Sequence, residues 1–299
     1  MKSRLIQIGL RAGACWLFVL FAAAAQATDQ RLSLWEVRGP HATVYLFGSI
    51  HACKPSCYPL PTSVLKHFDA SSTLALELDP TRVEGQTKIT EAATLPPGES
   101  LESKLSAQDL KDLRSVLADL GLPEEVVFRF RPWMVSTLIS LTALQKQGFS
   151  VDEGIDLWLL SRAKAENKSI VELETIDRQI AALTAGTERD QIDALRETLD
   201  MFQRHRVGPY FEEMISAWQR GDGKKIEALV EEDQGSDKSS DVELLDRRNE
   251  EMAVKIAQWL QQGDSSFVTV GVAHLVGPHN IGELLSRQGY KVRQLREGE

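Results

Sequence analysis

The chain has 299 residues, of which 42% are hydrophobic and 26% are charged, a composition typical of soluble globular proteins. This composition argues against intrinsic disorder, collagen-like repeats and a multi-pass membrane protein. The formal net charge of -9 has the wrong sign for holding a polyphosphate, so we expect no nucleic acid partner.

The N-terminal segment differs in character from the rest of the chain. It opens with basic residues, continues with an apolar run over 12–25 and ends in the small-x-small tripeptide 25–27. The fully apolar part is shorter than the roughly 20 residues that span a bilayer, which disfavours the alternative of a membrane anchor. We therefore predict a signal peptide over 1–27, cleavage after Ala27, no membrane span in the mature chain and a periplasmic or secreted location.

Two cysteines, Cys53 and Cys57, remain after removal of this segment. In an exported protein the first interpretation is a local disulfide. Because so short a loop loses little chain entropy on closure, the bond would shape the loop rather than hold the domain together. The alternative is a metal site that includes the neighbouring His51.

Strands and helices alternate from the start of the mature chain. Two strands at 32–37 and 43–47 predict a hairpin, and the apolar run at 72–78 predicts a buried strand. An amphipathic helix over 106–121 follows, and a second helix runs over 132–148.

The C-terminal half continues this alternation. A helix begins at Asp156 and leads into a strand at 167–173. Residues 187–262 are helical in period, with expected breaks at 208–209 and 221–223. Three further elements are predicted: a strand at 266–270, a helix near 281–288 and a strand at 290–292.

Helices that separate strands along the whole length predict an α/β domain. We expect a mainly parallel or mixed central sheet flanked by helices. This domain covers residues 28–299, with helical insertions near 81–147 and 187–262.

A Gly-x-x-His motif follows two of the predicted strands. Gly48 leads to His51 after one strand, and Gly271 leads to His274 after the other. The ligand crevice of an open α/β sheet lies outside the carboxyl ends of its strands, so both imidazoles can face one cavity. Each histidine alone is more typical of a structural residue, but the pair predicts a site.

Two glutamates occupy similar positions at strand ends. Glu77 and Glu174 each follow a short apolar strand, where a buried carboxylate requires a cation or hydrogen-bond donors. The alternative is an exposed strand end with its carboxylate in water. Two imidazoles with one or two carboxylates suit zinc, manganese or cobalt, and such an ion supports hydrolysis with a carboxylate as general base.

The sequence resembles the pattern of the TraB/GumN family. The matching segments are, in chain order, 48–51, 58–61, 77–79, 154–156, 173–175 with Gln179, 248–249, and 270–275 with Gly277. They cover most of residues 32–294, and only the stretch from about 81 to 147 is weakly marked. The family is related to the Tiki proteins, for which metal-dependent proteolysis is reported, and to erythromycin-esterase-like and haem-binding ChaN-like proteins.

This resemblance implies a metallohydrolase-like pocket. The metal ligands that it implies are His51, His274, Glu77 and Glu174, and the catalytic residues are Glu77, Glu174, Arg248 and Asn249. Without the resemblance, the pair at 248–249 would be interpreted as an exposed helix face. The chain departs from the family pattern in having cysteines after the first histidine turn, and it lacks the His-Glu-x-x-His helix of common zinc proteases.

The sequence therefore predicts a periplasmic metal-dependent hydrolase, most simply a peptidase, with a peptide or small-molecule substrate and a divalent transition metal ion. The alternative is an envelope protein that binds a metal, haem or small ligand without turnover. A third interpretation is an interaction role in which acidic helices bind a protein partner. The first two need the same pocket residues, so the sequence does not separate them.

Overall fold

The structure is a computed structural model that describes residues 30–233, 245–263 and 265–299. The predicted signal peptide lies outside these residues. In the part of the chain that is described, no helix is long and apolar enough to cross a bilayer.

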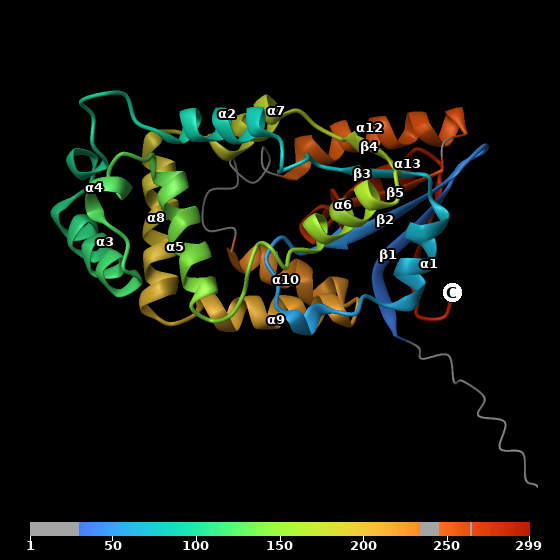
Figure 1. Cartoon of the computed structure of the whole chain (residues 1–299), viewed down its shortest axis with the longest axis horizontal. Coiled ribbons are helices and arrows are strands. Elements are labelled where there is room, and N and C mark those ends of the chain that lie inside the picture. Colours follow the sequence, from blue (N-terminus) through green and yellow to red (C-terminus); the bar gives the residue numbers. More distant parts are fainter. Residues whose placement is uncertain (1–29, 234–244, 264) are drawn as a thin grey trace, which may run out of the picture.

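One mixed sheet forms the centre of the molecule, with strand order β4-β3-β5-β2-β1-β6 (Figure 1). The strands are β1 Arg31–Arg38, β2 Thr43–Ser49, β3 Thr73–Leu76, β4 Ser169–Glu172, β5 Ser266–Gly271 and β6 Lys291–Arg296. Strands β4, β3, β5 and β2 are parallel, whereas β1 is antiparallel to both β2 and β6. The predicted α/β class and the predicted hairpin are thus confirmed.

The two faces of the sheet bury separate apolar cores because side chains alternate along each strand. On β5, Phe267 belongs to the larger core, and Val268 and Val270 belong to the smaller one. Helices α12 (Arg247–Gln262) and α13 (Ile281–Arg287) cover the smaller core. The helices over the other face are α1 Thr62–Ala70, α6 Ile155–Ala165, α9 Val207–Gln219 and α10 Gly223–Asp233.

A group of helices extends away from the sheet, on the left of Figure 1. It consists of α3 Ala107–Leu120, α4 Glu124–Val127, α5 Pro132–Gln145 and α8 Glu188–Gln203. Helix α3 has the limits that its sequence predicts: Ser106 and Asp109 form a capping box, and Gly121 ends the helix at a φ of 74°.

Two further helices, α2 (Val83–Ala93) and α7 (Ile176–Leu183), lie together beside the sheet (Figure 1). The short 3₁₀ segments are η1 Pro55–Cys57, η2 Leu101–Lys104 and η4 Val272–Leu275. Because α2 follows β3 and α7 follows β4, both helices start at the edge of the sheet where parallel strands end.

The predicted helix break at Gly208-Pro209 is wrong. Both residues lie in the first turn of α9, where proline is tolerated because the amide at that position needs no partner within the helix. The chain turns earlier, at 204–206, between α8 and α9. The other predicted break is confirmed, since Gly221 lies between α9 and α10.

We predict that Phe267→Ala lowers the free energy of unfolding by about 3–5 kcal/mol. The Phe267 ring is fully buried between Phe47 and Phe68, with ring centroids 5.8 and 5.5 Å away. Urea unfolding of the purified variant measures the loss. Val254→Ala is the control, because Val254 is 53% exposed and its truncation should change stability by less than about 0.5 kcal/mol.

Candidate functional site

Four predicted site residues meet where the parallel strands end. His51 follows β2, Glu77 follows β3, Glu174 follows β4, and His274 lies in η4 directly after β5. Both glutamates are buried, with 8% and 6% of their surface exposed, which rules out the alternative of carboxylates in open water. The parallel arrangement is the reason that residues distant in sequence converge at one edge.

Glu77 lies at the centre of this group. Its Oε1 accepts a hydrogen bond of 2.6 Å from the backbone N–H of Gly271, at the end of β5. Its Oε2 lies 2.6 Å from Nη2 of Arg248 and 3.8 Å from Nε2 of His274. Glu77 therefore contacts one of the two Gly-x-x-His turns, a buried cation and an imidazole.

Arg248, on α12, joins the two glutamates. Its Nε and Nη2 donate to the two oxygens of Glu174 at 2.9 and 2.6 Å, and Nη2 also donates to Glu77. Arg248 is 7% exposed and Asn249 is 2% exposed, so the alternative of an exposed helix face is wrong for both. Such a pairing of Arg248 with two buried carboxylates provides the cation that they need.

The surroundings shift the pKa of both glutamates and of His274. Burial raises the pKa of Glu174, and the bonds from Arg248 offset only part of that effect. Burial acts on Glu77 in the same direction, but the nearby imidazoles, Arg248 and a backbone N–H outweigh it and lower its pKa. Burial lowers the pKa of His274 to about 4, so this ring is neutral at pH 7.

His51 is oriented by a carboxylate from α6. Its Nδ1 lies 2.6 Å from Oδ2 of Asp156, whose Oδ1 accepts a hydrogen bond from the hydroxyl of Ser49. The negative charge of Asp156 raises the pKa of His51 to about 9, although the His51 side chain is 67% exposed on the pocket wall. A Cβ at Gly271 would lie 3.1 Å from Nε2 of His51 and 3.4 Å from Oε1 of Glu77.

His274 is oriented in a similar way, but its partner is a neutral amide instead of a carboxylate. Its Nδ1 lies 2.6 Å from Oδ1 of Asn249, and Nδ2 of Asn249 donates to the backbone oxygen of His279 at 2.9 Å. That second bond fixes the amide so that its oxygen faces the ring, and Nδ1 must then be the donor. The neutral ring of His274 therefore keeps its lone pair on Nε2, next to Glu77.

The donor chemistry of these residues fits a divalent transition metal ion. Histidines that ligate a metal through Nε2 commonly donate their Nδ1–H to a carboxylate or carbonyl oxygen, as His51 and His274 do. Ligand bonds of about 2 Å allow two ligands of one ion to lie about 4 Å apart, and His274 and Glu77 meet this limit. Within residues 30–233, 245–263 and 265–299, no three ligand side chains are arranged as a complete metal site.

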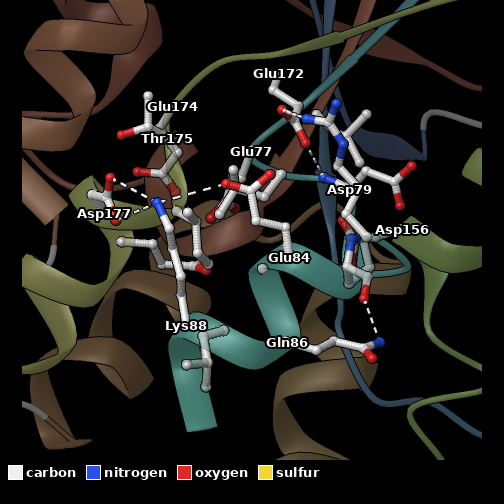
Figure 2. A pocket seen from close by; sticks show the side chains of 18 of the residues that line it. Glu77, Asp79, Glu84, Gln86, Lys88, Asp156, Glu172, Glu174, Thr175 and Asp177 are labelled. Atoms are coloured by element: carbon white, nitrogen blue, oxygen red, sulfur yellow. Dashed lines mark hydrogen bonds and ion pairs between the residues drawn. The ribbon is translucent and has the colours of Figure 1, made fainter. Parts of the chain in front are cut away.

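A cavity of about 510 Å³ opens at this edge of the sheet. His51, Glu77, Asp156 and Glu174 line its inner end, and His274 is not among its lining residues. Figure 2 shows α2, which carries Glu84, on one side of the cavity, with Glu77, Glu172 and Glu174 opposite it. His51, Glu77, Asp156 and Glu174 thus face a space large enough for a small molecule or part of a peptide.

Helices α2 and α7 are joined by an ion pair between two residues that line this cavity. Nζ of Lys88 on α2 lies 3.0 Å from Oδ1 of Asp177 on α7, and 3.7 Å from Oε1 of Glu84 (Figure 2). Both carboxylates are more than 70% exposed, so these ion pairs contribute little to stability.

The loop after His51 is closed by a disulfide between Cys53 and Cys57, with 6.4 Å between their Cα atoms. The predicted pairing is therefore present. Backbone bonds also connect Cys53 and Ser150 in both directions, at 3.0 and 2.8 Å. The loop is thereby attached to the segment that leads into α6, on the same side of the molecule as Asp156.

Sequence reasoning did not identify Asp156 or Ser49 as site residues. An acidic residue in the first turn of a helix is common, because it interacts favourably with the helix dipole, so Asp156 gives no separate signal. The available signal was the family-pattern segment 154–156, which contains both Gly154 and Asp156. A Cβ at Gly154 would lie 2.4 Å from the backbone oxygen of His51, so this glycine permits α6 to pack against the first histidine turn.

The model of the TraB/PrgY/gumN family matches residues 33–294. This chain belongs to the TraB/PrgY/gumN family. The match spans all the strand-end residues described above, together with Arg248 and Asn249 of α12.

The proteins similar to this chain include one whose name gives no activity and others that are named metalloproteases. The chain is 28% identical to the uncharacterized protein YbaP of Escherichia coli, over 81% of this chain and 87% of the relative. It is 26% identical to metalloprotease TIKI2 and 25% identical to metalloprotease TIKI1 of Danio rerio, over 88% and 91% of this chain but only 61% and 65% of those proteins. No solved structure matches the chain.

We predict that Arg248→Met lowers the free energy of unfolding by about 3–5 kcal/mol, because it leaves Glu77 and Glu174 buried without their shared cation. Chemical denaturation at pH 7 measures this loss. Arg287→Met is the matched control, since Arg287 is 55% exposed and its pair with Glu283 should contribute no more than about 1 kcal/mol. Equal losses in the two variants would show that the buried ion pairs of Arg248 stabilise the fold no more than the exposed pair of Arg287.

Proposed function

We propose that this protein is a metal-dependent hydrolase, that it acts on peptides, and that it works in the periplasm or outside the cell. The observation that carries the proposal is the convergence of His51 and His274 on Glu77, with Nδ1 of each ring held by an oxygen acceptor. The similarity to relatives named metalloproteases supports the same reaction class.

In this proposal, His51, His274 and Glu77 hold a zinc, manganese or cobalt ion. When bound, such an ion supplies Lewis acidity that polarises a carbonyl group and makes water more acidic. Asp156 and Asn249 keep the two rings in the orientation that directs Nε2 inward. The ion itself would compensate the negative charge of Glu77, a role that Arg248 shares.

We assign Glu174 and Arg248 to the substrate side of the centre. Glu174 lines the cavity, so its carboxyl group can exchange a proton with a bound substrate or water. Arg248 holds Glu174 through two bonds and fixes its position relative to Glu77. The peptide enters through the cavity beside α2 and α7 (Figure 2).

One observation favours the second candidate, a protein that binds a metal, haem or small ligand without turnover. All four carboxylate oxygens of Glu77 and Glu174 accept hydrogen bonds from Arg248 or Gly271. Hydrogen bonds to the charged form of a carboxylate favour that form, so these bonds reduce the tendency of either glutamate to take a proton as a general base. Turnover therefore separates the two candidates.

We predict that His51→Ala and His274→Ala each reduce the content of bound metal to a small fraction of the wild-type value, because each removes one nitrogen donor of a three-residue set. Elemental analysis after dialysis against zinc, manganese or cobalt measures the content. Cleavage of a peptide library, with and without a chelator, tests the reaction. Glu174→Gln should retain the metal and lose cleavage.

His41→Ala is the matched control for these variants. His41 is exposed and precedes β2, whereas His51 follows that strand, so the control removes an imidazole at the opposite end of the same element. Wild-type metal content in either site variant would contradict the proposed ligand set. Bound metal without any chelator-sensitive cleavage would instead favour the binding protein.

The proposed location has its own prediction. The mature protein from a bacterial periplasmic fraction should begin at Thr28, because the tripeptide 25–27 has the form that signal peptidase recognises. N-terminal sequencing measures this end directly. Ala27→Arg should block cleavage and leave a longer chain, and a wild-type protein that retains Met1 in the membrane fraction would contradict the prediction.

A further inference from the structure

We propose that Asp156 is a positioning residue that holds the His51 ring with its proton on Nδ1 and with Nε2 directed toward Glu77. The inference rests on the proposed function, in which His51 binds the metal. The contact of 2.6 Å between Oδ2 of Asp156 and Nδ1 of His51 is its first support. A carboxylate cannot donate in this contact, so the ring nitrogen must carry the proton.

Both carboxylate oxygens of Asp156 are held by hydrogen bonds. Its Oδ1 accepts a hydrogen bond from the hydroxyl of Ser49, the last residue of β2, while Oδ2 faces His51. The side chain of Asp156 is 13% exposed. One carboxylate therefore links the end of β2 to the histidine two residues later, through two different oxygens.

The backbone of α6 holds this carboxylate in place. Asp156 lies in the first turn of α6, where the helix dipole favours a negative charge. The N–H of Ile155 donates to the backbone oxygen of Ile50 at 3.0 Å. Gly154 packs so closely against the backbone of His51 that no side chain fits between them. The start of α6 and the histidine turn thus form one rigid unit.

His51 needs such a restraint more than His274 does. The His274 side chain is 4% exposed, so packing limits its rotation, whereas 67% of the His51 side chain is exposed. An exposed ring can rotate among several rotamers, and ordering it on metal binding costs conformational entropy. The bond to Asp156 removes that freedom before the metal arrives, and this is the physical basis of the proposed role.

The test uses zinc titration of the full mature chain with a competing chromophoric chelator. We expect Asp156→Ala to weaken zinc binding by about tenfold or more, the range seen when the acceptor behind a ligating histidine is removed. We expect Asp156→Asn to weaken it less, because an amide oxygen can still accept from Nδ1 while its nitrogen donates to Ser49. The expected order of affinity is therefore wild type, Asp156→Asn, Asp156→Ala.

Asp152→Ala is the matched control, because Asp152 is an exposed acidic residue in the segment just before α6. It should bind zinc as the wild type does, and chemical denaturation of each metal-free variant checks that the fold is retained. If Asp156→Ala does not fold, the comparison of Asp156→Asn with the wild type decides.

The outcomes separate this inference from the proposed function. Zinc binding by the wild type with equal affinity in both Asp156 variants would overturn the positioning role and leave the metal site intact. An equal loss in Asp152→Ala would also overturn it, because a general change of charge would then explain the effect. A wild-type protein that binds no zinc, manganese or cobalt would overturn both.

Discussion

The structure depends on the contact of one buried guanidinium with two buried carboxylates. Arg248 bonds to Glu77 and Glu174, so it links α12 to the ends of two neighbouring parallel strands. Removing carboxylates from water is costly unless a cation and donors replace the lost hydration. With Arg248 in this position, the next residue of α12, Asn249, lies within hydrogen-bond distance of His274. The same contact therefore neutralises the strand-end charges and places a second functional side chain.

Much of the fold and part of the site can be predicted from the sequence because both depend on local patterns. The alternation of strands and helices gives the α/β class, and strand direction explains why His51 and His274 lie at the same edge of the sheet. The position of Asp156 depends instead on how α6 packs against another part of the chain, which no local pattern encodes. The dipeptide Gly208-Pro209 is likewise ambiguous from sequence alone. A proline is compatible both with a break between helices and with the first turn of a helix, and here it lies in a first turn.

The two histidines reach a similar orientation by different physical means. His274 is buried in η4 and is held by a neutral amide, whereas His51 faces the cavity and is held by a charged carboxylate. Burial lowers the pKa of the first ring to about 4, and Asp156 raises that of the second to about 9. Two residues of the same type, in the same motif, therefore have opposite protonation preferences because their surroundings differ.

Gly271 lies where the two histidine turns and Glu77 come closest. A single methyl group at this position would occupy the space beside Nε2 of His51 and Oε1 of Glu77. The close approach of the His51 ring and the Glu77 carboxylate to the backbone therefore favours a residue without a side chain at position 271. Alanine at position 271, the smallest possible substitution, would therefore crowd the imidazole of His51 and the carboxylate of Glu77 from within the chain itself.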